Sequence, residues 1–248
     1  MLDGLYSAAT GMIGQQGRID AISNDLANTS TVGYKKLKFH FGDLLYQQMG
    51  DNRAMARGSE VGAGVRGQIM GRSMTQGTVE RTEQPFDLAL NGEGFFQVRT
   101  ADGQIGLTRD GSFEPDAQGR LVNSSGQLLT PEVRIPAGMD VGSIKIDAEG
   151  VVRGADGRQV GRIQPVTVGA PDQMQSIGDN LFAPTAASGP LRAAPAGTQV
   201  VQGALEGSNV DVSQSFADLI ESQRAYELSS RAVRTWDELL QTANQIRR

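Results

Sequence analysis

Apolar residues recur at intervals of seven near both ends of the chain, a spacing typical of helices that pack side by side. The N-terminal seam consists of Leu5, Met12, Ile19 and Leu26. The C-terminal seam consists of Val212, Leu219, Tyr226, Val233 and Leu240. The pattern predicts helices over residues 7–27 and 212–246, with these seams as the helix-packing residues.

The two predicted helices differ in how well they would form alone. A second C-terminal seam consists of Ser215, Ser222, Ser229, Trp236 and Ala243, and its small residues leave room for a partner helix. Asp211 followed by Gln214 resembles a capping box at the start of this helix. The N-terminal segment contains Gly11, Gly14 and Gly17. Each glycine costs about 1 kcal/mol relative to alanine inside a helix, so the N-terminal helix is expected to need a partner.

Between the two ends, the period of the pattern changes from helical to alternating. Phe86, Leu88 and Leu90 alternate with less apolar positions, and residues 96–98 and 144–146 repeat this alternation. Such segments are typical of half-buried strands. Five turn sequences with glycine separate them: NGEG at 91–94, ADGQ at 101–104, DAQG at 116–119, DAEG at 147–150 and ADGR at 155–158. We therefore predict a hairpin-rich β domain.

The expected fold class is α+β, with terminal heptad helices in a coiled-coil-like layer and a central all-β domain. The predicted divisions are an N-terminal helix at 1–35, an extended connector at 36–70, a β-rich domain at 71–183, a second connector at 184–207 and a C-terminal helix at 208–248. Packing of both seams inside one ordinary α+β core is the alternative.

Composition narrows the functional classes. The chain has 248 residues, a net charge of −5 and a pI near 5.0, which argues against a nucleic-acid binder. It has no cysteine, so disulfides, thiolate metal sites and cysteine nucleophiles are excluded. No apolar run approaches the roughly 20 residues that span a membrane, and the N-terminus lacks the basic start and apolar core of a cleaved signal peptide. We expect no membrane insertion.

Few residues suggest catalysis. His40 is the only histidine, and no nucleophile elbow or zinc-protease motif accompanies it. Asp110, Glu114 and Asp116 could supply a glycosidase-type pair of acids, but they lie in or beside turns, where aspartate bonds nearby backbone. The GxG of NGEGFF at 91–96 lacks the third glycine and the helix of a nucleotide site. No catalytic, cofactor-binding or metal site is therefore predicted, and no cofactor.

The segment NDLANTSTVGYKK, residues 24–36, ends the first predicted helix in an unusual way. Its junction residues are Asn24, Leu26, Ala27, Asn28, Gly33, Tyr34 and Lys35. Asn28 and Thr31 can bond backbone groups at the helix end, and Gly33 permits a backbone angle that other residues resist. Lys35, with Lys36 and Lys38, is expected to face solvent or another subunit. We interpret the segment as a hinge between the helix and the β domain.

This segment resembles the signature of the flagellar rod, hook and hook-associated axial family, in which an Asn-Leu-Ala-Asn run is followed by a Thr-x-Gly-aromatic-Lys turn. Further segments agree: FGDLLYQQ at 41–48, NGEGFFQV at 91–98, TRDGSF at 108–113, LEGSNVDV at 205–212 and SQRAYELSSRAV at 222–233. Together they extend nearly from end to end of the chain.

The resemblance implies a structural protein and not an enzyme. It implies a subunit that is exported unfolded through the flagellar type III apparatus, without a cleaved signal peptide, and assembles head to tail into the rod of the basal body. The rod would act as a drive shaft that carries motor torque to the hook, and the motifs favour its distal over its proximal part. The implied partners are further copies of the chain, other rod proteins and the hook protein, with the surrounding ring proteins as additional candidates.

A different class remains open from the residues alone. A secreted β-rich enzyme acting on peptidoglycan would use Glu114 or Asp116 as its acid. A carbohydrate-binding β module is a third reading, but the sequence shows no cluster of aromatic residues to support it.

Overall fold

The computed structural model describes residues 2–44, 47–48, 60–61, 64–136, 138–139 and 141–246. The chain forms two compact units. The helical unit comprises Met1–Ala27, Leu37–Met70 and Asp211–Arg248, and the β-rich unit comprises Asn28–Lys36 and Gly71–Val210. Terminal helices and a central β-rich region confirm the predicted α+β class.

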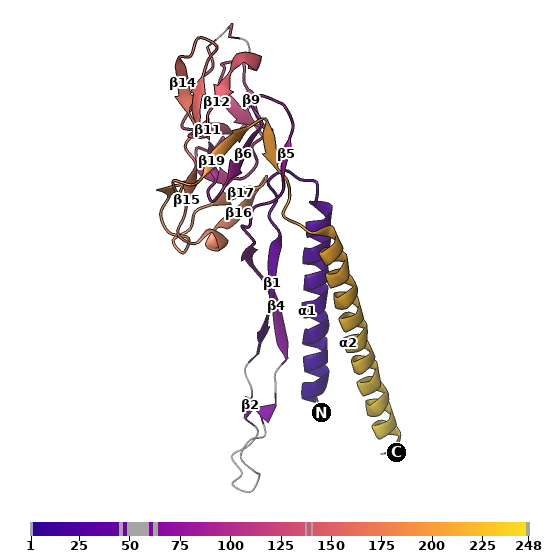
Figure 1. The fold of residues 1–248 in the computed structure, drawn as a ribbon. Helices are drawn as coiled ribbons and strands as arrows, with labels where there is room; N and C mark the ends of the chain where they lie inside the picture. Colours follow the sequence, from indigo (N-terminus) through magenta and orange to yellow (C-terminus); the bar gives the residue numbers. More distant parts are fainter. Residues whose placement is uncertain are drawn as a thin grey trace. The chain divides into compact units, whose positions relative to one another are not determined.

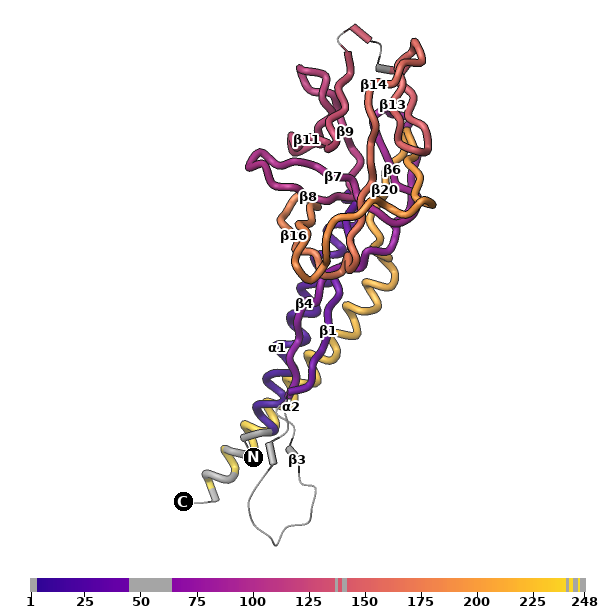
Figure 2. Tube along the Cα trace, turned by 90° about the vertical axis from the view of Figure 1, so that its left-hand side faces the viewer, coloured from indigo at the N-terminus to yellow at the C-terminus, as the bar shows by residue number. Residues whose placement is uncertain are grey.

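Two long helices dominate the helical unit. Helix α1 spans Leu2–Ala27 and α2 spans Val212–Ile246, as predicted for α2. Figures 1 and 2 show them side by side, running in opposite directions. Helix α1 begins earlier than the predicted residue 7, and Gly4 in this extra turn lies against Trp236, whose ring is 3.0 Å from where a Cβ would stand. The contact with α2 therefore supports the first turn.

The start of α2 is capped by a side chain. The Gln214 N–H donates to Asp211 Oδ1 at 3.0 Å, which confirms one half of the predicted capping box. The Gln214 side chain instead donates to Asp218 at 3.0 Å, one turn further along the helix. The reciprocal bond of a capping box is replaced by this contact within α2.

The segment expected as an extended connector, 36–70, contains paired strands. Strand β1 (Leu37–Asp43) pairs with β4 (Val65–Arg72), and β2 (Gln47–Gln48) pairs with β3 (Glu60–Val61). The Phe39 ring lies 3.3 Å from where a Gly17 Cβ would stand, and the Phe41 ring 2.9 Å from that of Gly14. The glycines that weaken α1 by propensity therefore leave space for the rings of β1.

The β-rich unit contains a seven-stranded antiparallel sheet in the order β16–β17–β8–β7–β11–β10–β9. In that order the strands are Gln175–Gly178, Leu181–Ala183, Ile105–Thr108, Phe96–Arg99, Leu128–Thr130, Leu121–Asn123 and Phe113–Pro115. A second sheet consists of β12 (Lys145–Ile146), β13 (Val151–Arg153) and β14 (Gln159–Arg162). Paired strands are β15 (Val166–Thr167) with β18 (Arg192–Ala193), β19 (Gln199–Gln202) with β6 (Leu88–Asn91), and β20 (Ala204–Glu206) with β5 (Val79–Arg81).

The core of this unit follows the predicted alternation in part. In β7, Phe96 and Val98 are buried while Gln97 between them is half-buried. In β6, Leu88 and Leu90 are buried, but so is Ala89, because β6 is enclosed on both faces. All five predicted turn sequences contain a glycine with positive φ: Gly92, Gly94, Gly103, Gly119, Gly150 and Gly157. The glycine-containing turn sequences were thus a more reliable guide to the ends of the strands than the alternation of apolar residues.

Residues 184–207, expected as a connector, instead contribute β18, β19 and β20 to the β-rich unit. Val200 is 4% exposed and Ala204 is 0% exposed, because β19 pairs with β6 and β20 pairs with β5. The small and polar residues of this stretch concealed these two buried positions. Among the described residues, no helix is both long and apolar enough to cross a membrane.

Candidate functional site

Three segments that are distant in the sequence bring one acidic and two basic side chains together inside the β-rich unit. Lys35 lies in the junction, Arg109 directly follows β8, and Glu206 ends β20. Lys35 Nζ lies 2.5 Å from Glu206 Oε1, and Arg109 Nη1 lies 2.9 Å from Glu206 Oε2. The side chains of Lys35 and Glu206 are 0% exposed and that of Arg109 is 4% exposed. We call these three residues the buried charge cluster.

Backbone groups complete the surroundings of the Lys35–Glu206 pair. Lys35 Nζ donates to the Thr75 carbonyl at 2.7 Å, and Glu206 Oε1 accepts the Gly77 N–H at 2.9 Å. Burial lowers the pKa of the Lys35 ammonium below its usual value. The Glu206 carboxylate opposes this shift of the pKa, and the charge of Arg109 adds to it. The cluster therefore holds two cationic groups around a single carboxylate.

Arg109 is held by the turn that follows β6. Its Nη2 donates to the Gly92 carbonyl at 2.7 Å, and its guanidinium carbon lies 5.4 Å from the centroid of the Phe95 ring. Within the described part of the chain, Arg109 Nε is buried without a hydrogen-bond partner. The arginine is thus fixed by its terminal nitrogens and by the ring.

Gly33 brings the junction against both other segments. Its N–H donates to the Glu206 carbonyl at 2.7 Å, and its φ is +68°. A Cβ at this position would stand 2.5 Å from the Asp110 backbone nitrogen. Because the positive φ and the close backbone both exclude larger residues, glycine is required here.

The following junction residues bond to the chain just before α2. The Lys36 N–H donates to Asn209 Oδ1 at 2.7 Å, and the Asn209 N–H donates to the Tyr34 carbonyl at 3.4 Å. Asn209 also donates to the Ser73 carbonyl at 2.8 Å. The Tyr34 ring is buried, and the guanidinium of Arg72 lies 5.0 Å from its centroid. Residues 28–36 are therefore an integral part of the β-rich unit, whereas the sequence suggested a hinge.

The other junction residues lie at the helix end. Asn24 and Ala27 are exposed in the last turns of α1, and Leu26 is half-buried there. The Asn28 carbonyl accepts the Thr31 N–H at 3.1 Å in the turn that follows. Burial of Lys35 contradicts the expected solvent-facing position, because a carboxylate distant in the sequence compensates its charge. Its partners are charged residues of the quoted segments TRDGSF and LEGSNVDV, but no local pattern in the sequence pairs them with Lys35.

In the helical unit, the two helices meet through small and polar residues at intervals of seven. A Cβ at Gly11 would stand 3.5 Å from Ser229 Oγ. Seven residues further along α1, Arg18 lies 3.7 Å from Asp218 and 3.3 Å from Glu221 of α2. Ser215 and Ser222 of the predicted small-residue seam are buried. Close approach of the helices is thus provided by side chains that occupy little space.

The predicted apolar seam lies beside this contact line. Met12, Tyr226 and Val233 line a groove of about 600 Å³ between α1 and α2. The rest of its lining is Ala9, Ile13, Gln16, Gly17 and Asp20. The other predicted packing residues are half-buried: Leu5, Ile19, Leu26 and Leu219. The side chain of Leu240 lies outside the described residues.

Large apolar side chains also face solvent on both helices. On α1, Tyr6 and Ile13 are 57% and 73% exposed. On α2, the exposed apolar side chains are Val212, Phe216, Ile220, Leu228 and Leu239. Apolar residues on more than one face are typical of a helix that is buried on several sides.

The acid candidate Asp116 is occupied by its own turn. Its Oδ1 accepts the N–H groups of Gln118 and Arg120, each at 2.8 Å, and Arg120 Nη2 lies 2.7 Å from its Oδ2. Desolvation alone would raise the pKa of Asp116, but these hydrogen bonds and the charge of Arg120 lower it. A general acid needs a raised pKa, so the environment of Asp116 opposes that role.

The other residues considered as catalytic candidates do not come together in a site either. Glu114 is exposed on β9, and His40 is exposed on β1 of the helical unit. Asp110 accepts the N–H and hydroxyl of Ser112, at 3.0 and 2.6 Å, within its own turn. Among the described residues, no three His, Asp or Glu side chains cluster as metal ligands would.

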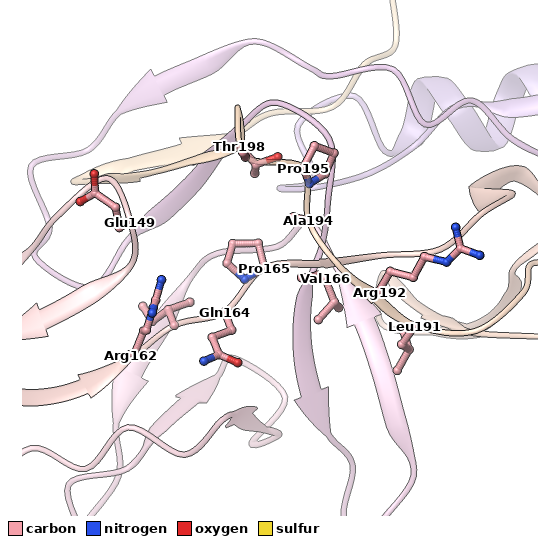
Figure 3. Close-up of a pocket in the computed structure, with 13 residues that line it drawn as sticks. Glu149, Arg162, Gln164, Pro165, Val166, Leu191, Arg192, Ala194, Pro195 and Thr198 are labelled. Carbon is pink, nitrogen blue, oxygen red and sulfur yellow. The ribbon is translucent and has the colours of Figure 1, made fainter.

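A groove of about 550 Å³ in the β-rich unit is lined by 13 residues around β15 and β18 (Figure 3). Its ionisable side chains are those of Glu149, Arg162 and Arg192. In Figure 3 the guanidinium of Arg192 extends away from Glu149. The groove therefore lacks a second carboxylate opposite Glu149, which a glycosidase-type mechanism needs.

Three family models match this chain. Residues 5–35 match "Flagella basal body rod protein", residues 89–154 match "Flagellar hook protein FlgE/F/G D1 domain", and residues 201–246 match "Flagellar basal body rod FlgEFG protein C-terminal". These matches include α1 with the junction, the centre of the β-rich unit and the segment from β20 to α2.

Full-length relatives identify the family more closely. The flagellar basal-body rod protein FlgG of Buchnera aphidicola subsp. Acyrthosiphon pisum is 38% identical over 99% of this chain and 100% of its own length. The chain belongs to the FlgG family of flagellar basal-body rod proteins. FlgG of Caulobacter vibrioides is 36% identical over 99% of the chain and FlgG of Borreliella burgdorferi 35% over 100%, each over 100% of the relative. FlgG-family proteins are structural rod components and not enzymes.

Each of the three matched regions contributes one residue to the buried charge cluster. Lys35 lies in the first matched region, Arg109 in the second and Glu206 in the third. The three matched regions of this FlgG-family chain are therefore joined by ion pairs inside one unit.

Proposed function

We propose that this chain is the subunit of the distal rod, assembled head to tail into a tube that transmits motor torque to the hook. The proposal rests on membership of the FlgG family and on the apolar groove and exposed apolar side chains of the helix pair. A heterologous contact that repeats without closing produces a helical filament. One copy thereby provides the groove and the next provides the side chains that fill it.

The degree of burial of the predicted packing residues supports this assignment. Met12, Tyr226 and Val233 are half-buried and line the groove in the isolated chain. A neighbouring copy would bury the remainder of these side chains, and each square ångström of apolar surface removed from water contributes about 25 cal/mol. The seams thus have apolar surface left for a contact between subunits.

Within the same proposal, α1 and α2 of successive copies form a coiled-coil-like inner layer. The spacing of Gly4, Gly11 and Arg18 along α1 is seven residues, as is that of Ser222 and Ser229 along α2. A period of seven keeps a contact line on one face of a helix over many turns. The β-rich unit would form the outer layer, which resists bending and twisting.

The expected partners are further copies of this chain, other rod proteins and the hook protein, and the surrounding rings are candidates. The site of action would be the basal body in the cell envelope, reached through the flagellar export apparatus. The rod and hook family matches support the axial partners.

Substituting exposed apolar residues of the helix pair tests the assembly. Ile13→Ser and Leu228→Ser remove side chains that are 73% and 64% exposed, so the isolated chain should retain its stability to within about 0.5 kcal/mol. Rods in isolated basal bodies should be absent or short in electron micrographs, and cells that depend on the variant should not swim.

Ile105→Ser is the matched control, because it removes an exposed isoleucine, 39% accessible, from the β-rich unit. It should leave rod length and swimming closer to the wild type. Normal rods from the Ile13→Ser and Leu228→Ser variants would contradict the proposed helix contacts. Absence of rods in all three variants would indicate that the subunit contacts also involve the β-rich unit.

A further inference from the structure

The buried charge cluster contains two positive charges and one negative charge, so losing Glu206 costs more than losing either cation. Lys35 and Arg109 each carry one positive charge, and Glu206 carries the single negative charge between them. Two like charges buried together without an anion are strongly unfavourable, because both lose hydration and repel each other. The cations can therefore be buried together only when Glu206 is in place.

A single carboxylate connects three segments of the chain. Glu206 Oε1 accepts from Lys35 Nζ and from the Gly77 N–H, and Oε2 accepts from Arg109. Glu206 itself is positioned by β20, where it pairs with Val79 of β5. Docking of β20 thus delivers the anion that both cations need.

Hydrogen bonds donated by backbone N–H groups connect the same segments independently of the charges. The Gly33 N–H donates to the Glu206 carbonyl, and the Lys36 N–H donates to Asn209 Oδ1. The Asn209 N–H in turn donates to the Tyr34 carbonyl. Residues 33–36 and 206–209 each supply bonding partners that the other lacks when it is undocked.

We propose that Glu206 closes a lock in which residues 28–36 and residues 204–209 dock onto the β-rich unit in one cooperative step. Neither segment holds its native place without the other. The segment that follows α1 and the segment that precedes α2 therefore become ordered together, and a chain that lacks residues 204–209 leaves two buried cations uncompensated. This goes beyond the rod assignment, because it concerns how one chain completes its own fold.

Amide hydrogen exchange of the full-length chain tests the lock. The N–H groups of Gly33, Lys36, Gly77 and Asn209 should exchange at a common opening rate in the wild-type chain. Glu206→Gln should accelerate their exchange together by at least about 100-fold, because it leaves two buried cations. Val98 and Leu129, paired in the seven-stranded sheet, should stay within about threefold of wild type.

Charge counting distinguishes this lock from packing alone. Lys35→Met leaves the Arg109–Glu206 pair neutral, so exchange should rise much less than in Glu206→Gln, although methionine is the less similar substitution in shape. The double variant Lys35→Met with Glu206→Gln contains only one buried cation and should exchange about tenfold more slowly than Glu206→Gln alone. Lys145→Met, which removes an exposed lysine from β12, is the control and should match the wild type.

Each outcome decides the proposal. A common acceleration in Glu206→Gln and its partial rescue in the double variant would support the lock. Independent exchange of Gly33 and Asn209, or a loss in Lys35→Met as large as in Glu206→Gln, would overturn it. Should Glu206→Gln fail to fold, the double variant is decisive: a folded chain supports the lock, and an unfolded chain overturns it.

Discussion

The helical unit leaves large apolar side chains in solvent, whereas the β-rich unit encloses even three charged ones. Ile13 and Leu228 are more than half exposed on the helices, while Lys35 and Glu206 are completely buried between strands. The β-rich unit thus buries its apolar core and pairs its buried charged side chains within one chain. The helical unit keeps apolar surface uncovered, as expected of the part of a rod subunit that contacts neighbouring copies.

The largest effect should come from the core of the β-rich unit. Phe96 is 1% exposed and its ring centroid lies 5.4 Å from that of Phe113. Phe96→Ala should lower the free energy of unfolding by about 4 kcal/mol, because it leaves a cavity in the core. Exchange of sheet amides should report this loss, with Ile13→Ala as a control that changes stability by less than about 0.5 kcal/mol.

The same variant also tests the separation of the two units. Trp236 of α2 is the only tryptophan, so its fluorescence reports on the helical unit. In Phe96→Ala the fluorescence transition in urea should remain at its wild-type midpoint. A parallel shift of both signals would mean that the units unfold as one cooperative block and would break the comparison.

A somewhat smaller effect is expected where the junction enters the β-rich unit. Gly33→Ala imposes a side chain at a φ of +68° and 2.5 Å from the Asp110 nitrogen. The β-rich unit should lose about 3 kcal/mol, since strain and a backbone clash combine. Urea unfolding followed by circular dichroism measures the loss. Gly126→Ala is the control, because φ there is +77° but nothing lies within 4 Å of the added Cβ; an equal loss would assign the effect to backbone strain alone.

The helices, the hairpin turns and the absence of a recognisable catalytic motif followed from local sequence patterns. A seven-residue period placed α2 correctly, and glycine-containing turns marked four hairpins of the β-rich unit. The fifth turn, NGEG, joins β6, which pairs with β19, to β7, which pairs with β8 and β11. The pairing of Lys35 with Glu206 could not be predicted, because the partners are 171 positions apart and no local period connects them. Strands β19 and β20 were missed for the same reason: their partners, β6 and β5, lie more than a hundred residues earlier.

Two glycines of α1 should respond differently to substitution by alanine, and the difference sharpens the description of the helical unit. A Cβ at Gly11 would meet Ser229 Oγ at 3.5 Å, an ordinary contact, whereas one at Gly14 would lie 2.9 Å from the Phe41 ring. Gly11→Ala should stabilise the helical unit by about 1 kcal/mol through helix propensity. Gly14→Ala should show no gain or a loss, because the ring must move. The midpoint of the Trp236 fluorescence transition in urea measures both, and an equal gain in the two variants would mean that Phe41 does not restrict α1.

The smallest effect should be a pH dependence of the β-rich unit that arises from Lys35. Burial lowers the pKa of this lysine in the folded chain below 10.5, the value expected when unfolded. Between these two pKa values the unfolded chain binds the proton more strongly, so the free energy of unfolding should rise as the pH increases through this interval. The penalty for a charged Lys35 is fully present below the folded pKa and is relieved above the unfolded one. Urea unfolding of wild type and Lys35→Met over this range isolates the slope, and Lys145→Met controls for the loss of a lysine. A fall in wild-type stability relative to Lys35→Met would mean that attraction to Glu206 outweighs burial, and the cluster would then behave as a favourable ion pair in place of a site with one excess positive charge.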